Sequence, residues 1–384
     1  MPIKFLDMFA GIGGFRSGLM AASGFACVGY CEIDRYAKQA YEAMYDTKGE
    51  LYFADARTID PNALPDLDLI CGGFPCQSFS IAGLRRGFRD DARGTLFFEI
   101  ARIAAVKRPP FLLLENVPGL LSHDGGRTFA AILGTLDELG YDVAWQVLNS
   151  KDFGVPQNRK RVYLIGYLRE RCAGEILSFR AADDAPAEAN GLLNPQQPDA
   201  ALPIKVNTRA GFQLAHPGDS IDFAFPTTNT RRGRVGRQIA HTVTHGNTQA
   251  CFFIDLNTAP KLTGATRCIT TRQDGGIGHH KGERSGVWVE ETDDGKFGVP
   301  VQTRDGETHY GRVRRLTPRE CWRLQGFTDE QFNLAAATGL SDARLYKMAG
   351  NAVSVPVIAA LGRFIKKIHT VEQKTQEVIA SRHP

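Results

Sequence analysis

The chain has 384 residues, of which 43% are hydrophobic, and a formal net charge of +4. That length suits two domains, or one large domain with an insertion, and the weakly basic charge permits a polyanionic partner without requiring one. No apolar run approaches the roughly 18 residues of a membrane span, and the opening MPIKFLDMFAG lacks the layout of a signal peptide. We therefore expect a soluble intracellular protein that does not bind a membrane.

Eight cysteines are spread along the chain without any C-x-x-C pair. Cys27 and Cys31 are four positions apart, and Cys71 and Cys76 are five apart, which are spacings that do not fit a zinc site. We therefore expect no metal. Most of the cysteines are expected to be small buried apolar residues in a reducing compartment.

The first half of the chain alternates apolar runs with amphipathic segments. This alternation predicts a mostly parallel, doubly wound α/β sheet, in which ligands bind at the carboxyl ends of the strands. Asp34 is the expected N-cap of the second helix. The predicted strands are 3–9, 26–33, 51–55, 66–72, 111–116, 141–149 and 161–168, and the predicted helices are 13–22, 34–45, 94–106 and 127–139.

A glycine-rich turn, FAGIGGFRSG, follows the first predicted strand and opens a helix. Its glycines match neither the P-loop, which needs Gly-Lys-Ser/Thr, nor the strict G-x-G-x-x-G spacing. Such a turn either lets a ligand lie against the backbone at a helix N-terminus or is only a tight connection between a strand and a helix. Glu32 and Asp55 end the next two strands and favour the ligand-binding interpretation. They could accept hydrogen bonds from a ribose and from an adenine amino group, respectively.

The stretch GFPCQSFS places Cys76 just after a predicted strand, at the start of a loop without apolar periodicity before Thr95. A thiol attacks only as thiolate and needs an electropositive, partly exposed site. The same loop suits a lid that closes on a polyanion, whereas the alternative is an ordinary half-buried loop cysteine. The loop carries Arg85, Arg86, Arg89 and Arg93.

Charged residues also flank two later apolar strands. FLLLENVPG puts Glu115 at a buried strand end, where burial is expected to raise its pKa until it holds a proton at neutral pH. The alternative is a carboxylate that caps the following turn. Arg159 and Arg161 share one face if their stretch is extended, and they form either a two-pronged grip on an anion or carbonyl group or a pair of surface arginines.

The composition changes after about residue 175. A loop rich in Ala, Pro and Asp leads into short strand-like pieces with many arginines between 205 and 315. Helices resume at 317–327, with Thr317 and Glu320 as a capping box and Pro318 at the first helical position. The apolar stretch 345–368 closes the fold, and the last dozen residues are polar and expected to fray.

In their order along the chain, these motifs resemble the DNA (cytosine-5) methyltransferase family of bacteria and phages. GFPCQSFS, ENVPG and QNRKRVYLIG carry the resemblance, which covers residues 3–168 and about 311–365. It implies a Rossmann-like, S-adenosylmethionine-dependent methyltransferase sheet with an inserted smaller, mainly β or irregular target-recognition domain. The implied boundaries are 1–178 for the first part of the catalytic domain, 179–316 for target recognition, 317–370 for a hinge helix and the return to the catalytic domain, and 371–384 for a frayed tail.

The resemblance implies transfer of a methyl group from S-adenosyl-L-methionine, leaving S-adenosyl-L-homocysteine, to carbon 5 of a cytosine flipped out of duplex DNA. Cys76 would add to carbon 6, Glu115 would protonate nitrogen 3, and Arg161 would bind the carbonyl oxygen. Arg159 would support the site or the backbone phosphate. The implied cofactor residues are Asp7, Phe9, Gly11, Gly13, Gly14, Glu32, Ile33, Asp55, Ala56, Pro75, Leu96, Asn351 and Val353, and the implied DNA contacts are Gln77, Ser78, Ser80, Arg85, Arg267, Thr270, Arg272 and Gln273.

Double-stranded DNA is the implied partner, and a cognate restriction endonuclease acting on the same site fits the resemblance without direct contact. A cytoplasmic monomer that meets the nucleoid through its DNA is expected. Two alternatives stay open at this point: an RNA cytosine-5 methyltransferase, and a catalytically inactive homologue that only binds DNA.

Overall fold

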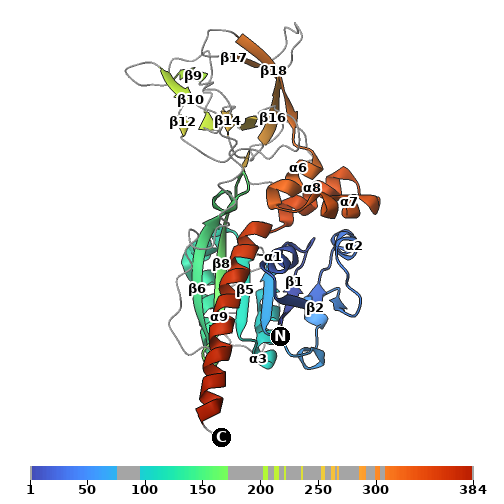
Figure 1. Ribbon diagram of the computed structural model, residues 1–384, viewed down its shortest axis with the longest axis vertical. Coiled ribbons are helices and arrows are strands. Elements are labelled where there is room, and N and C mark those ends of the chain that lie inside the picture. The colour runs from blue at the N-terminus through green and yellow to red at the C-terminus, as the bar shows by residue number, and fades with distance from the viewer. Residues whose placement is uncertain are drawn as a thin grey trace.

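The computed structural model describes residues 2–75, 96–171 and 316–382, together with the backbone of short strands between residues 202 and 315. Figure 1 shows an α/β body at one end and the short strands at the other, with a unit of helices between them. The α/β body and the helical unit hold the candidate site.

The α/β body is built on a seven-stranded sheet in the order β3-β2-β1-β4-β5-β8-β6. Neighbouring strands from β3 to β5 run parallel, whereas β8 runs antiparallel to both β5 and β6. The predicted doubly wound, mostly parallel sheet is therefore confirmed. The strands are β1 (Ile3–Met8), β2 (Phe25–Cys31), β3 (Leu51–Phe53), β4 (Leu69–Gly73), β5 (Phe111–Asn116), β6 (Tyr141–Asn149) and β8 (Lys160–Leu168).

Helices cover both faces of this sheet. On one face, Phe15 of α1 and Leu361 of α9 pack in one apolar cluster with strand residues such as Phe5. On the other face, Ile100 of α3 and Ile132 of α4 belong to a second cluster. Because α9 comes from the end of the chain, the first and last segments share a core (Figure 1). The helices are α1 (Gly14–Ala22), α2 (Arg35–Met44), α3 (Leu96–Lys107), α4 (Arg127–Glu138) and α9 (Val355–Arg382).

Helix starts follow the sequence closely. The Asp34 carboxylate accepts hydrogen bonds from the backbone N–H groups of Tyr36 and Ala37, which confirms it as the N-cap of α2. Thr317 and Glu320 form the predicted capping box. The end of the chain differs from expectation, because α9 stays helical to Arg382 and so includes most of the tail that was expected to fray.

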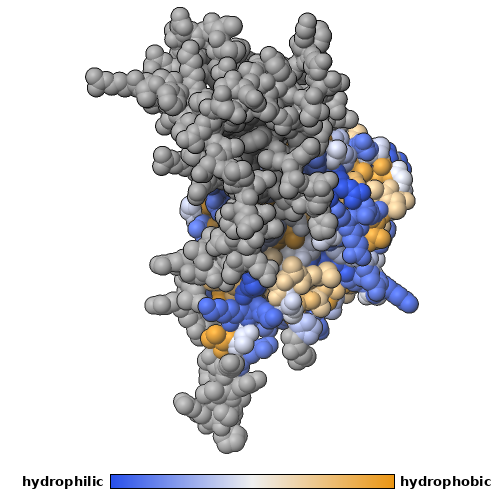
Figure 2. All heavy atoms as spheres, turned by 45° about the horizontal axis from the view of Figure 1, so that its top comes forward, coloured by the Kyte–Doolittle hydropathy of each residue, from blue (hydrophilic) through white to orange (hydrophobic). Residues whose placement is uncertain are grey.

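The helical unit consists of α6 (Pro318–Gln325), α7 (Asp329–Ala337) and α8 (Asp342–Asn351). Its core is centred on the fully buried Trp322 and extends to Ala37 and Ala40 of α2. Its described surface mixes hydrophilic and apolar side chains (Figure 2). Among the described residues, one helical stretch, Asp342–Val371, could cross a membrane by length and composition alone, but 83% of its most apolar window is buried inside the protein.

The backbone described between residues 202 and 315 forms short antiparallel pairs and one five-stranded sheet in the order β14-β13-β16-β18-β17. Figure 1 shows these strands beyond the helical unit, away from the seven-stranded sheet. The strands are β9 (Leu202–Lys205), β10 (Phe212–Ala215), β11 (Ser220–Ile221), β12 (Val235–Gly236), β13 (Phe252–Asp255), β14 (Lys261–Thr263), β15 (Thr266–Arg267), β16 (Ser285–Glu290), β17 (Val299–Gln302) and β18 (Thr308–Arg315).

A cluster of polar groups is buried between β1, α1 and α2. The Arg16 guanidinium forms a two-pronged ion pair with Glu50, with both N–O distances 2.7 Å, and its carbon lies 4.6 Å from the Tyr45 ring centroid. The Tyr41 hydroxyl donates to Asp7 over 3.4 Å. Burial raises the pKa of Asp7 to about 8, although Arg16 and the Tyr41 hydroxyl act in the opposite direction. Asp7 is thus a buried acid within the core.

Helices α1 and α9 approach closely at Gly18. A Cβ added to Gly18 would lie 2.5 Å from the Ile358 Cβ and 2.8 Å from the Val355 carbonyl oxygen. The helix pair that joins the two ends of the chain therefore requires a residue without a side chain here.

We predict that Gly18→Ala destabilises the protein by about 1–3 kcal/mol, because the added methyl group overpacks the α1–α9 contact. The matched control is Gly134→Ala in α4, where an added Cβ meets no described atom within 4 Å. That change should stabilise by about 0.5–1 kcal/mol through helix propensity. Urea unfolding measures both, and an equal effect of the two changes would contradict the packing argument.

We also predict that Asp7 makes stability fall with rising pH. Its folded pKa of about 8 lies above the ordinary value of 3.8, so the folded state holds the proton more tightly than the unfolded state. The stabilisation is therefore full below the ordinary pKa and is lost as the pH rises toward the folded one. From about pH 5.5 to about pH 8.5 the free energy of unfolding of the native protein should fall by about 3 kcal/mol more than that of Asp7→Asn. Urea unfolding at a series of pH values measures this, and the same pH dependence of stability in both proteins would contradict the prediction.

Candidate active site

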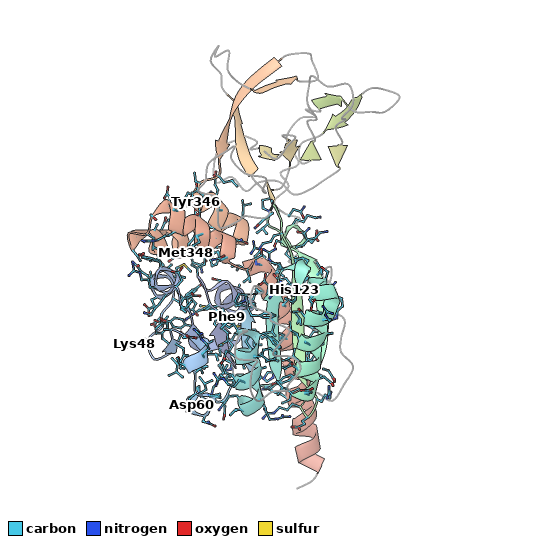
Figure 3. All side chains as sticks on the ribbon, turned by 180° about the vertical axis from the view of Figure 1, so that it is seen from behind. Phe9, Lys48, Asp60, His123, Tyr346 and Met348 are labelled. Carbon is cyan, nitrogen blue, oxygen red and sulfur yellow. The ribbon has the colours of Figure 1, made fainter. Side chains whose placement is uncertain are left out.

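A cavity of about 780 Å³ lies where β1, β2, β4 and β5 end, and α8 forms part of its wall. Figure 3 shows two of its lining residues, Phe9 at the end of β1 and Met348 on α8, on facing parts of the molecule. The cavity is therefore lined by residues that come from both the early and the late parts of the chain.

The glycine turn after β1 forms one end of the cavity. Phe9 and Gly11 both have a φ of 56°, a left-handed conformation that is uncommon for phenylalanine and marks functional turns. A Cβ added to Gly11 would meet no described atom within 4 Å, so this glycine borders open space. At Gly14, in contrast, an added Cβ would lie 2.7 Å from the Val353 Cγ2. Gly11 thus leaves room in the cavity, and Gly14 allows close packing at its wall.

Glu32, which follows β2, lines the same end and is 9% exposed. One carboxylate oxygen accepts from the Gly11 N–H and the other from the Asp34 N–H, both over 2.7 Å. Burial raises the pKa of Glu32, and these two backbone donors oppose that shift. The two bonds fix the orientation of a carboxylate that can still accept from a ligand through its remaining lone pairs.

Glu115 and Arg161 form the other end of the cavity. Glu115 is the last residue but one of β5 and is 8% exposed, and the Arg161 Nε lies 3.1 Å from its Oε1. Burial raises the pKa of Glu115, while the nearby Arg161 and Arg159 guanidinium groups partly offset that rise. The predicted buried acid is therefore present, with a cation on β8 beside it.

Arg159 connects this end of the cavity to the end of the chain. It is 3% exposed, and its Nη2 donates to the carbonyl oxygens of Gly350 over 3.2 Å and Ala352 over 2.8 Å. These two carbonyls flank Asn351, which lines the cavity. Arg159 therefore fixes the backbone turn that presents Asn351.

Asn116 was not singled out from the sequence, yet it lines the cavity and is 3% exposed. Its Nδ2 donates to the Phe74 carbonyl over 2.7 Å, which holds the end of β4 against the end of β5. The available signal was the ENV tripeptide, because an amide at the end of an all-apolar strand needs a buried partner. Asn116 thus anchors the backbone just before Pro75 and Cys76.

A basic rim at α8 and the start of α2 was also missed. Lys347 forms an ion pair with Asp34, with an Nζ–Oδ2 distance of 2.9 Å, and the Arg344 guanidinium carbon lies 3.3 Å from the Tyr36 ring centroid. The helical spacing of Arg344, Lys347 and Met348 could have revealed this, because positions three and four apart share one face of a helix. All five of these residues line the cavity.

The structure divides the predicted site residues into three groups. Those that line the cavity are Phe9, Gly11, Gly14, Glu32, Pro75, Glu115, Arg159, Arg161, Asn351 and Val353. A second group belongs to the described residues but does not line the cavity: Asp7, Gly13, Ile33, Asp55, Ala56 and Leu96. Those outside the described residues are Cys76, Gln77, Ser78, Ser80, Arg85, Thr270, Arg272 and Gln273, and only the backbone of Arg267 is described.

The second group has identifiable surroundings. A Cβ on Gly13 would lie 2.5 Å from the Tyr45 ring, so this glycine serves packing. The Asp55 carboxylate is paired with Arg57, whose Nη2 lies 2.7 Å away, and Ala56 is buried. Ile33 is 73% exposed. Within the described ranges, no group of three or more His, Cys, Asp or Glu residues is arranged to hold a metal ion.

Comparison with known proteins agrees with this geometry. The family model described as C-5 cytosine-specific DNA methylase matches residues 3–367. The chain is 36% identical to the type II methyltransferase M.NlaX of Neisseria lactamica, over 94% of this chain and 96% of that protein. It is 30% identical to the orphan methyltransferase M.SPRI of Bacillus phage SPR, over 98% of this chain and 99% of that protein.

Among solved structures, the fold is similar to that of S. pombe Dnmt2 methyltransferase, with a TM-score of 0.58 at 15% identity, over 96% of this chain and 99% of that one. A match at this identity supports the fold alone, whereas the family model and the curated relatives cover nearly the whole sequence. The chain therefore belongs to the C-5 cytosine-specific DNA methylase family.

Proposed function

We propose that this enzyme methylates carbon 5 of a cytosine in a specific duplex DNA sequence, with S-adenosyl-L-methionine as methyl donor and Cys76 as nucleophile. One observation carries the proposal: a buried acid beside a guanidinium, Glu115 with Arg161, shares a cavity with a glycine turn and a fixed carboxylate. The first pair suits protonation of a base, and the second suits a nucleoside-containing cofactor.

The residues fit such a cofactor. A cavity of about 780 Å³ is within the range typical of small-molecule sites. Gly11 borders open space, and Glu32 offers an oriented carboxylate for ribose hydroxyls. In the proposal Phe9, Gly11, Glu32, Asn351 and Val353 hold the cofactor. When bound, S-adenosyl-L-methionine supplies an electrophilic methyl group.

Cys76 and Glu115 act together on the target base. The Cys76 thiolate forms a bond to carbon 6, the ring electrons move toward nitrogen 3, and that nitrogen takes the proton held by the Glu115 carboxyl. Carbon 5 becomes nucleophilic as a result. After methylation the proton on carbon 5 leaves to a base, and the bond between carbon 6 and sulfur breaks with its electrons returning to Cys76 as thiolate. Nitrogen 3 gives its proton back to the Glu115 carboxylate, so both residues are regenerated.

The surroundings of these residues support their roles. Burial favours the protonated form of Glu115, as a proton donor requires. Arg161 lies beside it on the cavity wall, where its guanidinium can donate to the carbonyl oxygen of the base. Asn116 holds the Phe74 carbonyl, so the backbone that leads into Cys76 starts from a fixed point.

Duplex DNA is the proposed partner, and methylation of the site of a cognate restriction endonuclease is the proposed biological context. The name of M.NlaX as a type II methyltransferase, together with its bacterial source, supports that context and a cytoplasmic location. Gln77, Ser78, Ser80 and Arg85 after the nucleophile, and Arg267, Thr270, Arg272 and Gln273 in the inserted region, are the proposed DNA contacts. Bisulfite sequencing of exposed plasmid DNA would identify the methylated site.

We predict that Cys76→Ala reduces incorporation of tritiated methyl groups into duplex DNA to background, because no covalent addition to carbon 6 can occur. Binding of S-adenosyl-L-homocysteine and of DNA should persist. Cys27→Ala, which removes a thiol outside the cavity lining, should keep its activity.

A duplex with 5-fluorocytosine at the mapped site localises the nucleophile. Fluorine cannot leave as the proton does, so the adduct should accumulate, and mass spectrometry should place it on Cys76. An adduct at another residue would contradict the assignment, and labelling of transfer RNA instead of duplex DNA would contradict the substrate.

We predict that Glu115→Gln lowers kcat by about 10²–10⁴-fold, because an amide keeps the hydrogen-bonding shape but cannot supply the proton. The affinity for S-adenosyl-L-homocysteine should change little, since Glu32 and the glycine turn form the other end of the cavity. Single-turnover kinetics and calorimetry separate the two effects. A variant with native kcat would show that Glu115 does not protonate the base.

A further inference from the structure

Four buried polar side chains lie behind the cavity, at the junction of β7 (Gln157–Asn158), the helical unit and α9. They are Gln157, Gln325, Ser354 and Ser150, and each is at most 2% exposed. We call them the amide–serine joint. None of them lines the described cavity, so they take no direct part in the proposed chemistry.

Gln325 is the centre of the joint. Its Nε2 donates to the Ala349 carbonyl over 2.6 Å, and its Oε1 accepts from the Gln157 Nε2 and from the Ser354 hydroxyl, each over 3.2 Å. One amide group thus bonds to β7, to α8 and to the start of α9. Because its donor and acceptor ends are both used, only one orientation of the amide satisfies the contacts.

The other members extend these contacts. The second bond from the Gln157 Nε2 reaches the Leu324 carbonyl over 2.8 Å. The Ser150 hydroxyl lies within hydrogen-bond distance of two acceptors, the Ser354 hydroxyl oxygen at 2.5 Å and the Arg159 carbonyl oxygen at 3.2 Å, and its single hydrogen bonds to one of them at a time. Buried hydrogen bonds of this kind hold their partners in one arrangement, because breaking one leaves a polar group that has neither water nor a partner.

On one side the joint holds the turn that presents Asn351. Gln325 binds the Ala349 carbonyl, and Arg159 binds the carbonyls of Gly350 and Ala352. The backbone from residue 349 to residue 352 is therefore fixed by side chains from α6 and from the segment after β7. Any shift of β7 relative to α6 would displace this wall of the cavity.

On the other side the joint meets the inserted region. The backbone of β7 pairs in parallel with β15, with Gln157 opposite Thr266 and Asn158 opposite Arg267. Gln157 thus belongs both to a strand pair with the inserted region and to the joint. Of the DNA contacts proposed in the inserted region, Arg267 lies in β15, and Thr270, Arg272 and Gln273 follow it in the sequence.

We infer that the amide–serine joint couples DNA recognition to cofactor affinity, with Gln325 as the positioning residue that links β15, through β7, to the Asn351 turn. DNA that is held by the inserted region constrains β15, β15 constrains β7, and the joint transmits this to the cofactor wall. By reciprocity, bound cofactor favours the same arrangement of β15 and strengthens DNA binding by the same factor. This inference rests on the proposed function.

The coupling can be measured on the full chain by calorimetry with S-adenosyl-L-homocysteine. The readout is the ratio of its Kd without DNA to its Kd with a saturating duplex that carries the mapped site. For the native protein we expect a ratio in the range of about 5–150 that coupled sites typically show. Gln325→Met, which keeps the length of the side chain and removes all three bonds, should bring this ratio close to one.

A second variant and a control distinguish coupling from loss of stability. Ser354→Ala removes one hydroxyl from the joint and should lower the ratio by about threefold or more, even if Gln325→Met does not fold. Tyr141→Phe removes a buried hydroxyl that donates to the Pro109 carbonyl over 2.8 Å, at the opposite end of β6 from Ser150, and should keep the native ratio.

The outcomes are separable from those of the proposed function. A native ratio of one, an unchanged ratio in Ser354→Ala, or an equal fall in Tyr141→Phe would overturn the inference while methylation continued. A native protein that neither binds S-adenosyl-L-homocysteine nor methylates DNA would instead overturn the proposed function. A fall confined to the joint variants would establish it as the coupling element.

Discussion

The pair of hydrogen bonds from Arg159 to the carbonyls of Gly350 and Ala352 is the contact on which the site depends. The cavity has walls from the first and last segments of the chain, which are separated in sequence by the whole inserted region. A buried guanidinium cannot remain without acceptors, and two buried carbonyls cannot remain without donors. Arg159 satisfies both needs at once, so the turn that carries Asn351 has one stable position relative to β8 and Glu115. The packing of α1 on α9 around Gly18 brings the same two segments together on the face of the sheet.

The two carboxylates of the cavity are buried to a similar extent but have different partners. Glu32 accepts from two backbone N–H groups, which are neutral, whereas Glu115 lies beside the Arg161 guanidinium. Burial raises the pKa of both. The backbone bonds orient Glu32 and suit it to accepting hydrogen bonds from a ligand. Burial favours the protonated form of Glu115, and the adjacent Arg161 guanidinium can balance the carboxylate charge once the proton is given up, which is the arrangement that the proposed acid catalysis requires. The proposed division of the cavity into a cofactor-binding end and a catalytic end thus rests on the different partners of two similar residues.

The sequence predicted the architecture well because its signals are local. Alternating apolar and amphipathic segments identified the sheet, and Asp34, Thr317 and Glu320 marked helix starts that the structure confirms. It could not separate Gly11, which borders the cavity, from Gly13, which packs against Tyr45, because the two differ only in their tertiary neighbours. Asp7 lies inside β1, one residue before its end, where its carboxylate is buried in the core, whereas Glu32 follows β2 and lines the cavity. Asn116, Gln157 and Gln325 were missed because their partners are carbonyls and amides far away in the sequence.

The contacts around the cavity differ greatly in strength from one side to the other. At the rim, α8 meets α2 through the Lys347–Asp34 ion pair and the stacking of Arg344 on Tyr36, which are partly exposed. Exposed pairs contribute about 0–1 kcal/mol and weaken with salt. At the opposite wall, the same helix is held by buried bonds from Gln325 and Arg159 to consecutive parts of one turn. The weaker contacts of α8 therefore lie at the rim, and its stronger contacts lie at the buried wall. The coupling that we propose uses the strong contacts of α8 at the buried wall and leaves the contacts at the rim untouched.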